Sequence, residues 1–203
     1  MKKVRRFLLA IVLCLSIASN AQERFELQKI GFSIAVPEGW FTFSDTEMMQ
    51  NLEKFDFTEQ QRDNLSKNLN ESILLKTFTK YNPKKVAGII PTIKITLRTN
   101  PTKSDEAFLD FVKAMNRGAK MQLDEFSVVE QPVLKQISGS SAVTSVYSFM
   151  LKMGDENYKI KSDTYYISRG NYFITLNFIE EIDKEDNKSV FDSLLQSVIL
   201  TKP

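Results

Sequence analysis

Acidic residues gather near the end of the chain, between residues 180 and 186. Carboxylates placed at alternate positions, as in the run from Asp183 to Asn187, could bind Ca²⁺ through their oxygen atoms. Lys188, however, occupies the position at which an EF-hand loop needs glycine. Two interpretations stay open: negative charge that complements the N-terminal dipole of a following helix, or contact with a cation or a partner. The residues concerned are Glu180, Glu181, Asp183, Glu185 and Asp186.

The residue types most often used in catalysis are scarce. The chain has no histidine, and its only cysteine is Cys14. Zinc sites, Ser-His-Asp and Cys-His constellations, haem ligation and iron–sulfur clusters depend on these side chains, so the sequence predicts none of them. A carboxylate pair, a Ser-Lys arrangement and an oxygen-ligated Mg²⁺ or Ca²⁺ site stay possible.

Short catalytic and nucleotide-binding motifs are also missing after residue 21. We find no glycine-rich phosphate-binding loop, no G-x-S-x-G and no S-x-x-K. The sequence therefore predicts no cofactor and no enzymatic activity. Catalysis by paired carboxylates stays open, because the second carboxylate could come from anywhere in the fold.

Residues 1–21 have the three-part layout of a secretory signal peptide. Four basic residues precede the apolar run Phe7–Ala18, and Ser19 and Ala21 provide the small residues of a cleavage site before Gln22. The apolar run is too short for a membrane-spanning helix, which needs about 20 residues. We therefore predict cleavage after residue 21 and no stable membrane insertion afterwards.

Loss of this leader changes the composition of the protein. Removing 21 of the 203 residues leaves 182, and removing 4 of the 27 basic side chains leaves 23 against 25 acidic ones. A formal charge of −2 does not favour nucleic-acid binding, which needs a concentrated basic face. Cys14 is lost too, so the domain must be stabilised by its core alone. We expect a bacterial protein that is periplasmic or secreted.

Apolar periodicity predicts one α+β domain over residues 22–203. A strand from Phe32 to Val36 ends at Pro37-Glu38-Gly39, and two more strands follow at 72–80 and 91–99. Four consecutive strands at 126–137, 142–152, 157–167 and 172–179 have very short connections. They must therefore form an antiparallel meander. This gives an antiparallel sheet of six to seven strands.

Two amphipathic helices should cover this sheet. The longer begins near Ser104, with apolar residues at helical spacing from Phe108 to Ala119, and lies in a crossover. The second spans about 184–196, and the tail Ile199–Thr201 could pair with a sheet edge. We therefore expect an α-β-α sandwich with helices on both faces.

Aromatic residues and methionines could form a ligand site. Trp40 follows a turn, and packing in the core is its expected role, with contact to a ligand as the alternative. Capping boxes at Ser44–Glu47 and Thr58–Gln61 predict two short helices. Their methionines, Met48 and Met49, could fill the core or adapt to a ligand.

Two segments resemble the Mog1/PsbP-like fold family. Phe32-Ser-Ile-Ala-Val-Pro-Glu-Gly-Trp40 is similar to its opening strand, which runs into Pro-x-x-Trp. The ending, Tyr172–Phe178 followed by Phe191–Ile199, is similar to its final strand, acidic loop and helix. Known members include a Ran-GTPase-binding factor, extrinsic photosystem subunits and exported bacterial proteins. The resemblance implies a non-catalytic α-β-α sandwich, and it transfers no functional residues.

Three functions are compatible with the sequence. The first is an exported, non-enzymatic binding or accessory module that recognises a protein or another component of the cell envelope. The second is a carrier for a small apolar or amphipathic ligand, held between the sheet and the region Met48–Leu69. The third is a hydrolase that uses carboxylates and no histidine.

Overall fold

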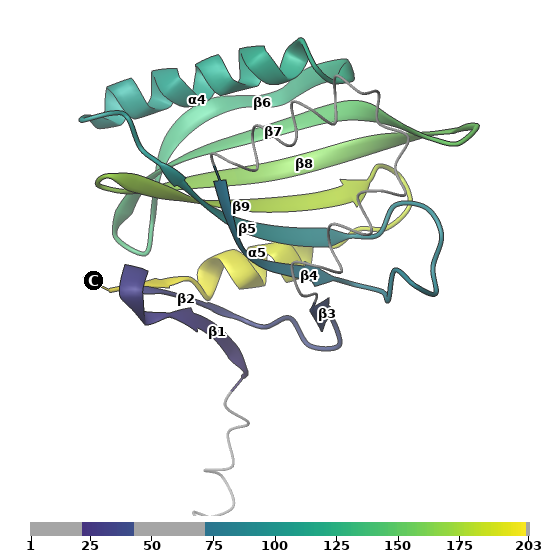
Figure 1. Cartoon of the computed structure of the whole chain (residues 1–203), viewed down its shortest axis with the longest axis horizontal. Helices are drawn as coiled ribbons and strands as arrows, with labels where there is room; N and C mark the ends of the chain where they lie inside the picture. The colour runs from purple at the N-terminus through teal and green to yellow at the C-terminus, as the bar shows by residue number, and fades with distance from the viewer. Residues whose placement is uncertain (1–21, 43–71, 202–203) are drawn as a thin grey trace, which may run out of the picture.

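The computed structural model describes residues 22–42 and 72–201. A long helix, α4, lies on one face of a large sheet, and a shorter helix, α5, lies on the other face together with a small sheet (Figure 1). This is the predicted α+β arrangement with helices on both faces. No helix among the described residues is long and apolar enough to cross a membrane.

The large sheet has seven strands, all antiparallel to their neighbours. Their order across the sheet is β3-β4-β5-β9-β8-β7-β6. The predicted meander is confirmed, because the last four strands of the chain in this sheet are consecutive neighbours. The strands are β3 (Phe41–Thr42), β4 (Ser72–Thr79), β5 (Thr92–Thr99), β6 (Asp124–Ile137), β7 (Ser140–Met153), β8 (Glu156–Arg169) and β9 (Tyr172–Glu181).

The strands of the meander are longer than their apolar patterns predict. Only two residues separate β6 from β7, and both Ser138 and Gly139 have positive φ angles of 48° and 76°. Such two-residue turns match the twist of the flanking strands, so pairing continues up to the turn. The ladder therefore includes polar residues such as Glu156 and Arg169, which carry no apolar signal.

A second sheet joins segments near both ends of the described chain. Its central strand, β2 (Phe32–Ala35), pairs with β1 (Arg24–Leu27) and with β10 (Ile199–Leu200). The early strand is thus confirmed, but it belongs to this small sheet, and β3 takes the seventh place in the large one. The predicted pairing of the tail with a sheet edge is β10 on β2. Gly31 follows the short 3-10 helix η1 (Gln28–Ile30) at φ 57°.

Helix α4 (Asp105–Lys120) begins as its sequence predicts. The hydroxyl of Ser104 accepts a hydrogen bond from the Ala107 backbone N–H at 3.2 Å, which satisfies one of the free amides of the first turn. Phe108 and Val112 are fully buried against Val143, Tyr166 and Phe173. They form the smaller core on this face of the sheet.

The larger core lies between the sheet, the small sheet and α5 (Lys188–Gln196). Phe191 of α5 stacks on Phe178 of β9, with ring centroids 4.8 Å apart. Phe32 and Ile34 of β2 complete this layer. The face of the sheet toward α5 is therefore called the α5 side, and the opposite face the α4 side.

Candidate functional site

Strands β8 and β9 carry buried polar groups on both faces, in the middle of an otherwise apolar sheet. Alternation along β8 places Lys161 and Asp163 on the α5 side and Ser162 and Thr164 on the α4 side, because successive side chains point to opposite faces. Each set forms its own network. The network on the α5 side contains ion pairs, whereas the network on the α4 side contains neutral hydroxyl and amide groups.

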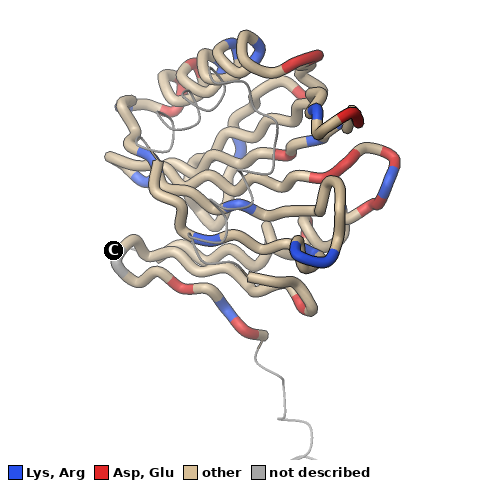
Figure 2. The backbone as a smooth tube through the Cα atoms, turned by 45° about the vertical axis from the view of Figure 1, so that its right-hand side comes forward, with Lys and Arg blue, Asp and Glu red and all other residues tan. Residues whose placement is uncertain are grey.

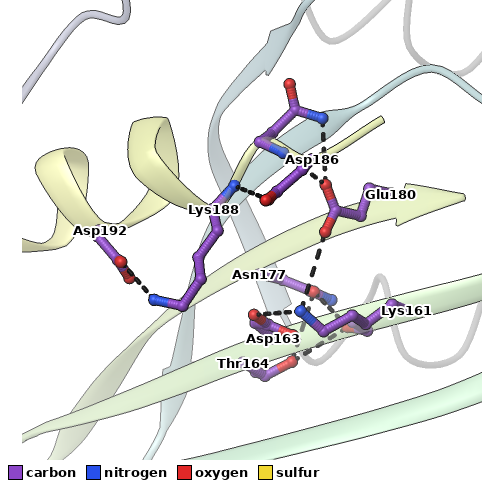
Figure 3. Close-up of polar contacts among 10 residues, drawn as sticks. Lys161, Asp163, Thr164, Asn177, Glu180, Asp186, Lys188 and Asp192 are labelled. Carbon is purple, nitrogen blue, oxygen red and sulfur yellow. Dashed lines mark hydrogen bonds and ion pairs between the residues drawn. The ribbon is translucent and has the colours of Figure 1, made fainter. Parts of the chain in front are cut away.

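The network on the α5 side is centred on Lys161, which lies between two carboxylates (Figure 3). Its Nζ is 3.1 Å from Oδ2 of Asp163 and 3.9 Å from Oε1 of Glu180. Glu180 is 7% exposed and accepts hydrogen bonds from the backbone N and the side-chain Nδ2 of Asn187, at 3.3 and 3.1 Å. Asp163 Oδ1 is buried without a hydrogen-bond partner among the described residues. This network fixes the start of α5 to β9.

A second group of contacts connects the residues after β4 with the loop that precedes α5. Lys80 Nζ lies 2.5 Å from Oε2 of Glu185 and 2.8 Å from Oδ1 of Asn187, and the Tyr81 hydroxyl donates to Glu185 at 2.8 Å. The hydrogen bond from Lys80 is the main cause that lowers the pKa of Glu185, and the same bond raises the pKa of Lys80. Burial acts in the opposite direction on both groups. We call the contacts among Lys80, Lys161, Glu180, Glu185 and Asn187 the acidic clamp.

These contacts bear on the interpretations of residues 180–186, and no acidic residue lies in the first turn of α5 to complement its dipole. Two more of the five carboxylates are engaged: Glu181 pairs with Lys184 at 2.9 Å, and Asp186 accepts a hydrogen bond from the Lys188 backbone N–H at 2.9 Å. Across residues 22–42 and 72–201, no group of three or more acidic residues could hold a metal ion. Four of the five carboxylates thus make contacts that hold the loop before α5.

The predicted start of the last helix was four residues too early. The sequence indicated residue 184, whereas α5 begins at Lys188. Asp183 has a left-handed φ of 65°, which breaks a helix, and Lys80 holds Glu185 in the loop. Asn187 precedes the helix, but its side chain bonds Lys80 and Glu180 and does not cap the first turn.

The network on the α4 side consists of neutral groups. Asn177 of β9 accepts hydrogen bonds from Ser162 at 2.6 Å and Thr164 at 3.4 Å, and Thr164 also reaches the Tyr147 hydroxyl at 3.3 Å. Farther along this face, Asn116 of α4 donates to Ser145 at 2.8 Å. A row of hydroxyls and amides thus crosses β7, β8 and β9.

Beyond this row, β5 and β9 present a group of donors that we call the donor cluster: Lys94, Thr96, Thr175 and Asn177. Lys94 is directly opposite Asn177, and Thr96 is directly opposite Thr175. Neither Lys94 nor Thr96 has a hydrogen-bond or ion-pair partner among the described residues. Thr175 is 9% exposed, and its buried hydroxyl is also unpartnered in the described part of the chain. Burial, and secondarily the charge of Arg98, lowers the pKa of Lys94.

Apolar side chains are exposed along β6, the long strand at one end of the large sheet. Val129, Val133 and Leu134 are 58%, 44% and 40% exposed. Val133 and Leu134 are consecutive in a regular stretch of the ladder, so they point to opposite faces of the sheet. We call these three residues the β6 rim.

Trp40 packs on the large core, as expected. Its ring meets that of Phe191 edge to face, with centroids 6.2 Å apart. Its other side borders an open hollow of about 520 Å³, which the turn Pro37–Gly39 and residues Gln22, Glu23 and Val36 also line. The predicted leader, the two short helices of 44–69 and their methionines lie outside the described residues.

The architecture is that of the Mog1/PsbP-like fold, as the sequence resemblance implied. The chain is similar to CyanoP, the PsbP protein of the cyanobacterium Synechocystis, with a TM-score of 0.52 and 14% identity over 91% of this chain and 95% of that one. A protein of Bacteroides thetaiotaomicron gives a TM-score of 0.50 at 14% identity over 89% of this chain. That match covers 49% of the Bacteroides protein, so this chain spans about half its length.

The Ran-binding protein Mog1p of Saccharomyces cerevisiae gives a TM-score of 0.49 at 10% identity, over 89% of this chain and 96% of that one. No family profile and no curated protein sequence matches the chain. The likeness to CyanoP and to the Bacteroides protein, each at 14% identity, establishes the fold alone. The function must be argued from this chain's own residues.

Proposed function

We propose that this protein is an exported, non-enzymatic binding or accessory module of the cell envelope, and that it recognises a protein partner through the β6 rim. Export is supported by the signal-peptide pattern of residues 1–21. The described Lys and Arg residues are spread among Asp and Glu residues over helix, strands and loops (Figure 2). A mixed surface of this kind suits a protein partner better than a nucleic acid.

The observation that carries the proposal is the exposure of apolar side chains at a free sheet edge. From Val133 to Ile137, β6 pairs regularly with β7. Because β6 ends the order of strands, the opposite side of its backbone pairs with no other described strand. Such an edge can accept an added strand, with main-chain hydrogen bonds for affinity and side-chain contacts for specificity. Val133 and Leu134 would provide apolar contacts on both faces.

The first half of β6 is protected against indiscriminate pairing. Its register with β7 shifts between Val128 and Val133, and Pro132 lies within that interval. Bulges and proline are common means of blocking pairing between copies of an edge strand. The free edge is thus restricted to a short stretch, as expected for selective binding.

The charges of β6 indicate the kind of partner. Asp124, Glu125 and Glu130 are exposed, and Lys135 is the only basic residue of the strand. A partner that complements this surface would present an extended apolar segment with basic residues at one end.

Site-specific photo-crosslinking from residue 136 tests the proposal. A partner captured by the wild-type protein in its own cell envelope should be lost in a Val133→Glu/Leu134→Glu variant. The matched control is Ile73→Glu, which changes a 64% exposed apolar residue on β4. Circular dichroism should show that both variants are folded. Equal capture by the wild type and the double variant would exclude the β6 rim as the binding surface.

Cleavage of the leader has a separate test. The N-terminal sequence of the protein recovered from the periplasm or the medium should begin at Gln22. Recovery of the intact N-terminus from the cytoplasm alone would contradict export without affecting the result for β6.

One alternative function is supported by a specific observation. The donor cluster has hydrogen-bonding capacity that no described residue uses, as expected of a carrier for a small ligand. The hydrolase alternative is less well supported, because the carboxylates at β8 and β9 are engaged with lysines and Asn187 in the acidic clamp.

A further inference from the structure

The donor cluster lies on the α4 side of the two central strands. Directly opposite residues of an antiparallel pair have Cβ atoms about 5 Å apart, and residues two apart on one strand are about 7 Å apart. Lys94, Thr96, Thr175 and Asn177 thus form a four-cornered group within reach of one small functional group. Lys94, Thr96 and Asn177 each keep some exposed surface, whereas Thr175 is buried.

The orientation of Asn177 makes this group rich in donors. Its Oδ1 faces β8, where it accepts from Ser162 and Thr164. Asn177 lies directly opposite Lys94 of β5, and its amide nitrogen makes no hydrogen bond to a described residue. The two amide N–H groups, the ammonium of Lys94 and the hydroxyls of Thr96 and Thr175 are all available as donors.

The same corner contains no described carboxylate to balance Lys94. Glu180 and Asp163 lie on the opposite face, where they contact Lys161. An ammonium that is partly desolvated and unpaired destabilises the folded protein, and its lowered pKa reflects that cost. Thr175 adds an unpartnered buried hydroxyl. Groups of this kind are retained at binding sites more often than in passive cores.

The charge and the surroundings define the ligand. The ammonium of Lys94 is the one charge within the donor cluster, Arg98 adds a second positive charge farther along the same face of β5, and the neutral donors match the oxygens of a carboxylate. Leu74 lies opposite Thr96 on β4, and Ile179 follows Asn177 on the same face of β9. Both are partly exposed apolar neighbours. We propose that the donor cluster binds the carboxylate of a small molecule with an apolar body, such as a medium-chain fatty acid.

This site is independent of the β6 rim, so the two proposals can fail separately. The experiment is isothermal titration calorimetry of the full chain with decanoate, with decanol and with inorganic phosphate as comparison ligands. Decanoate should bind the wild type in the micromolar to millimolar range. Lys94→Met should weaken decanoate binding at least tenfold and leave decanol binding unchanged, since decanol lacks the charge.

Two further variants separate binding from folding. Thr175→Val keeps the shape of the side chain and removes a donor, so it should weaken decanoate binding severalfold. The matched control is Lys76→Met, which removes a lysine from the α5 side of β4, where its ammonium lies 5.7 Å from the ring centre of Phe25. That control should bind decanoate as the wild type does.

Three outcomes would overturn the proposal. The first is the absence of decanoate binding at millimolar concentration. The second is equal affinity of the wild type and Lys94→Met for decanoate. The third is tighter binding of phosphate than of decanoate, which would show that the site prefers a phosphate group to a carboxylate.

Discussion

The two faces of the central sheet differ in how completely their buried polar groups are paired. On the α5 side, the acidic clamp places each charged group against an opposite charge or Asn187, at distances of 2.5 to 3.9 Å. On the α4 side, hydroxyls and amides bond one another, while Lys94 and Thr175 are left without described partners. The presence of paired charges can be explained by their contribution to the stability of the fold. Unpaired donors cost stability, and ligand binding would explain their presence.

The largest expected effect comes from removing the central carboxylate of the acidic clamp. Glu180→Ala leaves the backbone N–H and the side-chain amide of Asn187 without their buried acceptor and removes one of the two carboxylates beside Lys161, which should lower the free energy of unfolding by about 3 kcal/mol. Urea unfolding followed by Trp40 fluorescence measures this change. Glu181→Ala, which breaks a surface pair with Lys184, should cost less than about 0.5 kcal/mol. Equal effects of the two changes would show that the clamp contributes no more than a surface ion pair.

The pH dependence of stability tests the outer part of the clamp. The pKa of Glu185 is lowered in the folded protein, so its contribution is present above its unfolded value of about 4.3 and is lost as the pH falls through the folded value. Lys80 has a raised pKa, so its contribution is lost only at strongly alkaline pH.

The comparison of the wild type with Glu185→Gln isolates this effect. The variant should be about 1 kcal/mol less stable at neutral pH, and the difference should shrink below pH of about 4. Thermal unfolding between acidic and neutral pH gives the two curves. If the stability difference between the wild type and Glu185→Gln did not change with pH, the charge of Glu185 would not be its cause.

Lys94→Met should raise the free energy of unfolding, by an amount similar to or smaller than the loss expected for Glu185→Gln. It removes an unpaired, partly desolvated ammonium, so we expect a gain of about 1 kcal/mol, or about 2–4 °C in Tm. The lowered pKa means that the penalty exists while Lys94 is charged and disappears as the pH rises toward its unfolded value. The gain should therefore fade at alkaline pH. A loss of stability would show that Lys94 is part of a structural network.

The smallest expected effect is that of Thr175→Val. The buried hydroxyl makes no hydrogen bond to a described residue, so its removal should leave the free energy of unfolding unchanged within about 0.5 kcal/mol or raise it slightly. Ser162→Ala is the sharper comparison, because that hydroxyl donates to Asn177 at 2.6 Å and its loss should cost about 1 kcal/mol. Similar losses for both changes would contradict the distinction between bonded and unused donors.

The meander was readable from the sequence because its signals are local. Glycine turns and alternating apolar residues fix strand, turn and next strand without reference to distant segments. β1 and β3 were missed, because strands of four and two residues are too short to show a periodic pattern and form only through pairing with β2 and β4. The start of α5 was misplaced for the same reason, since Lys80 acts on Glu185 from another part of the chain.

Only the part of the donor cluster that lies on β5 could be predicted from the sequence. The alternation of Ile93, Ile95 and Leu97 with Lys94 and Thr96 predicted a strand with one wet face or one face under a helix. Nothing in that pattern indicated which strand would lie beside it, because sheet register depends on long-range pairing. Once β9 is the neighbour, Lys94 faces Asn177 and a lone lysine becomes part of a binding site.

The hydrogen bonds between β2 and β10 determine when the protein can finish folding. Phe32 and Ile34 are made early, but the strand and helix that cover them come from the last part of the chain. The apolar layer beneath the large sheet cannot close until Leu200 has been synthesised. Until then the nascent polypeptide keeps the apolar side chains of β2 exposed to solvent.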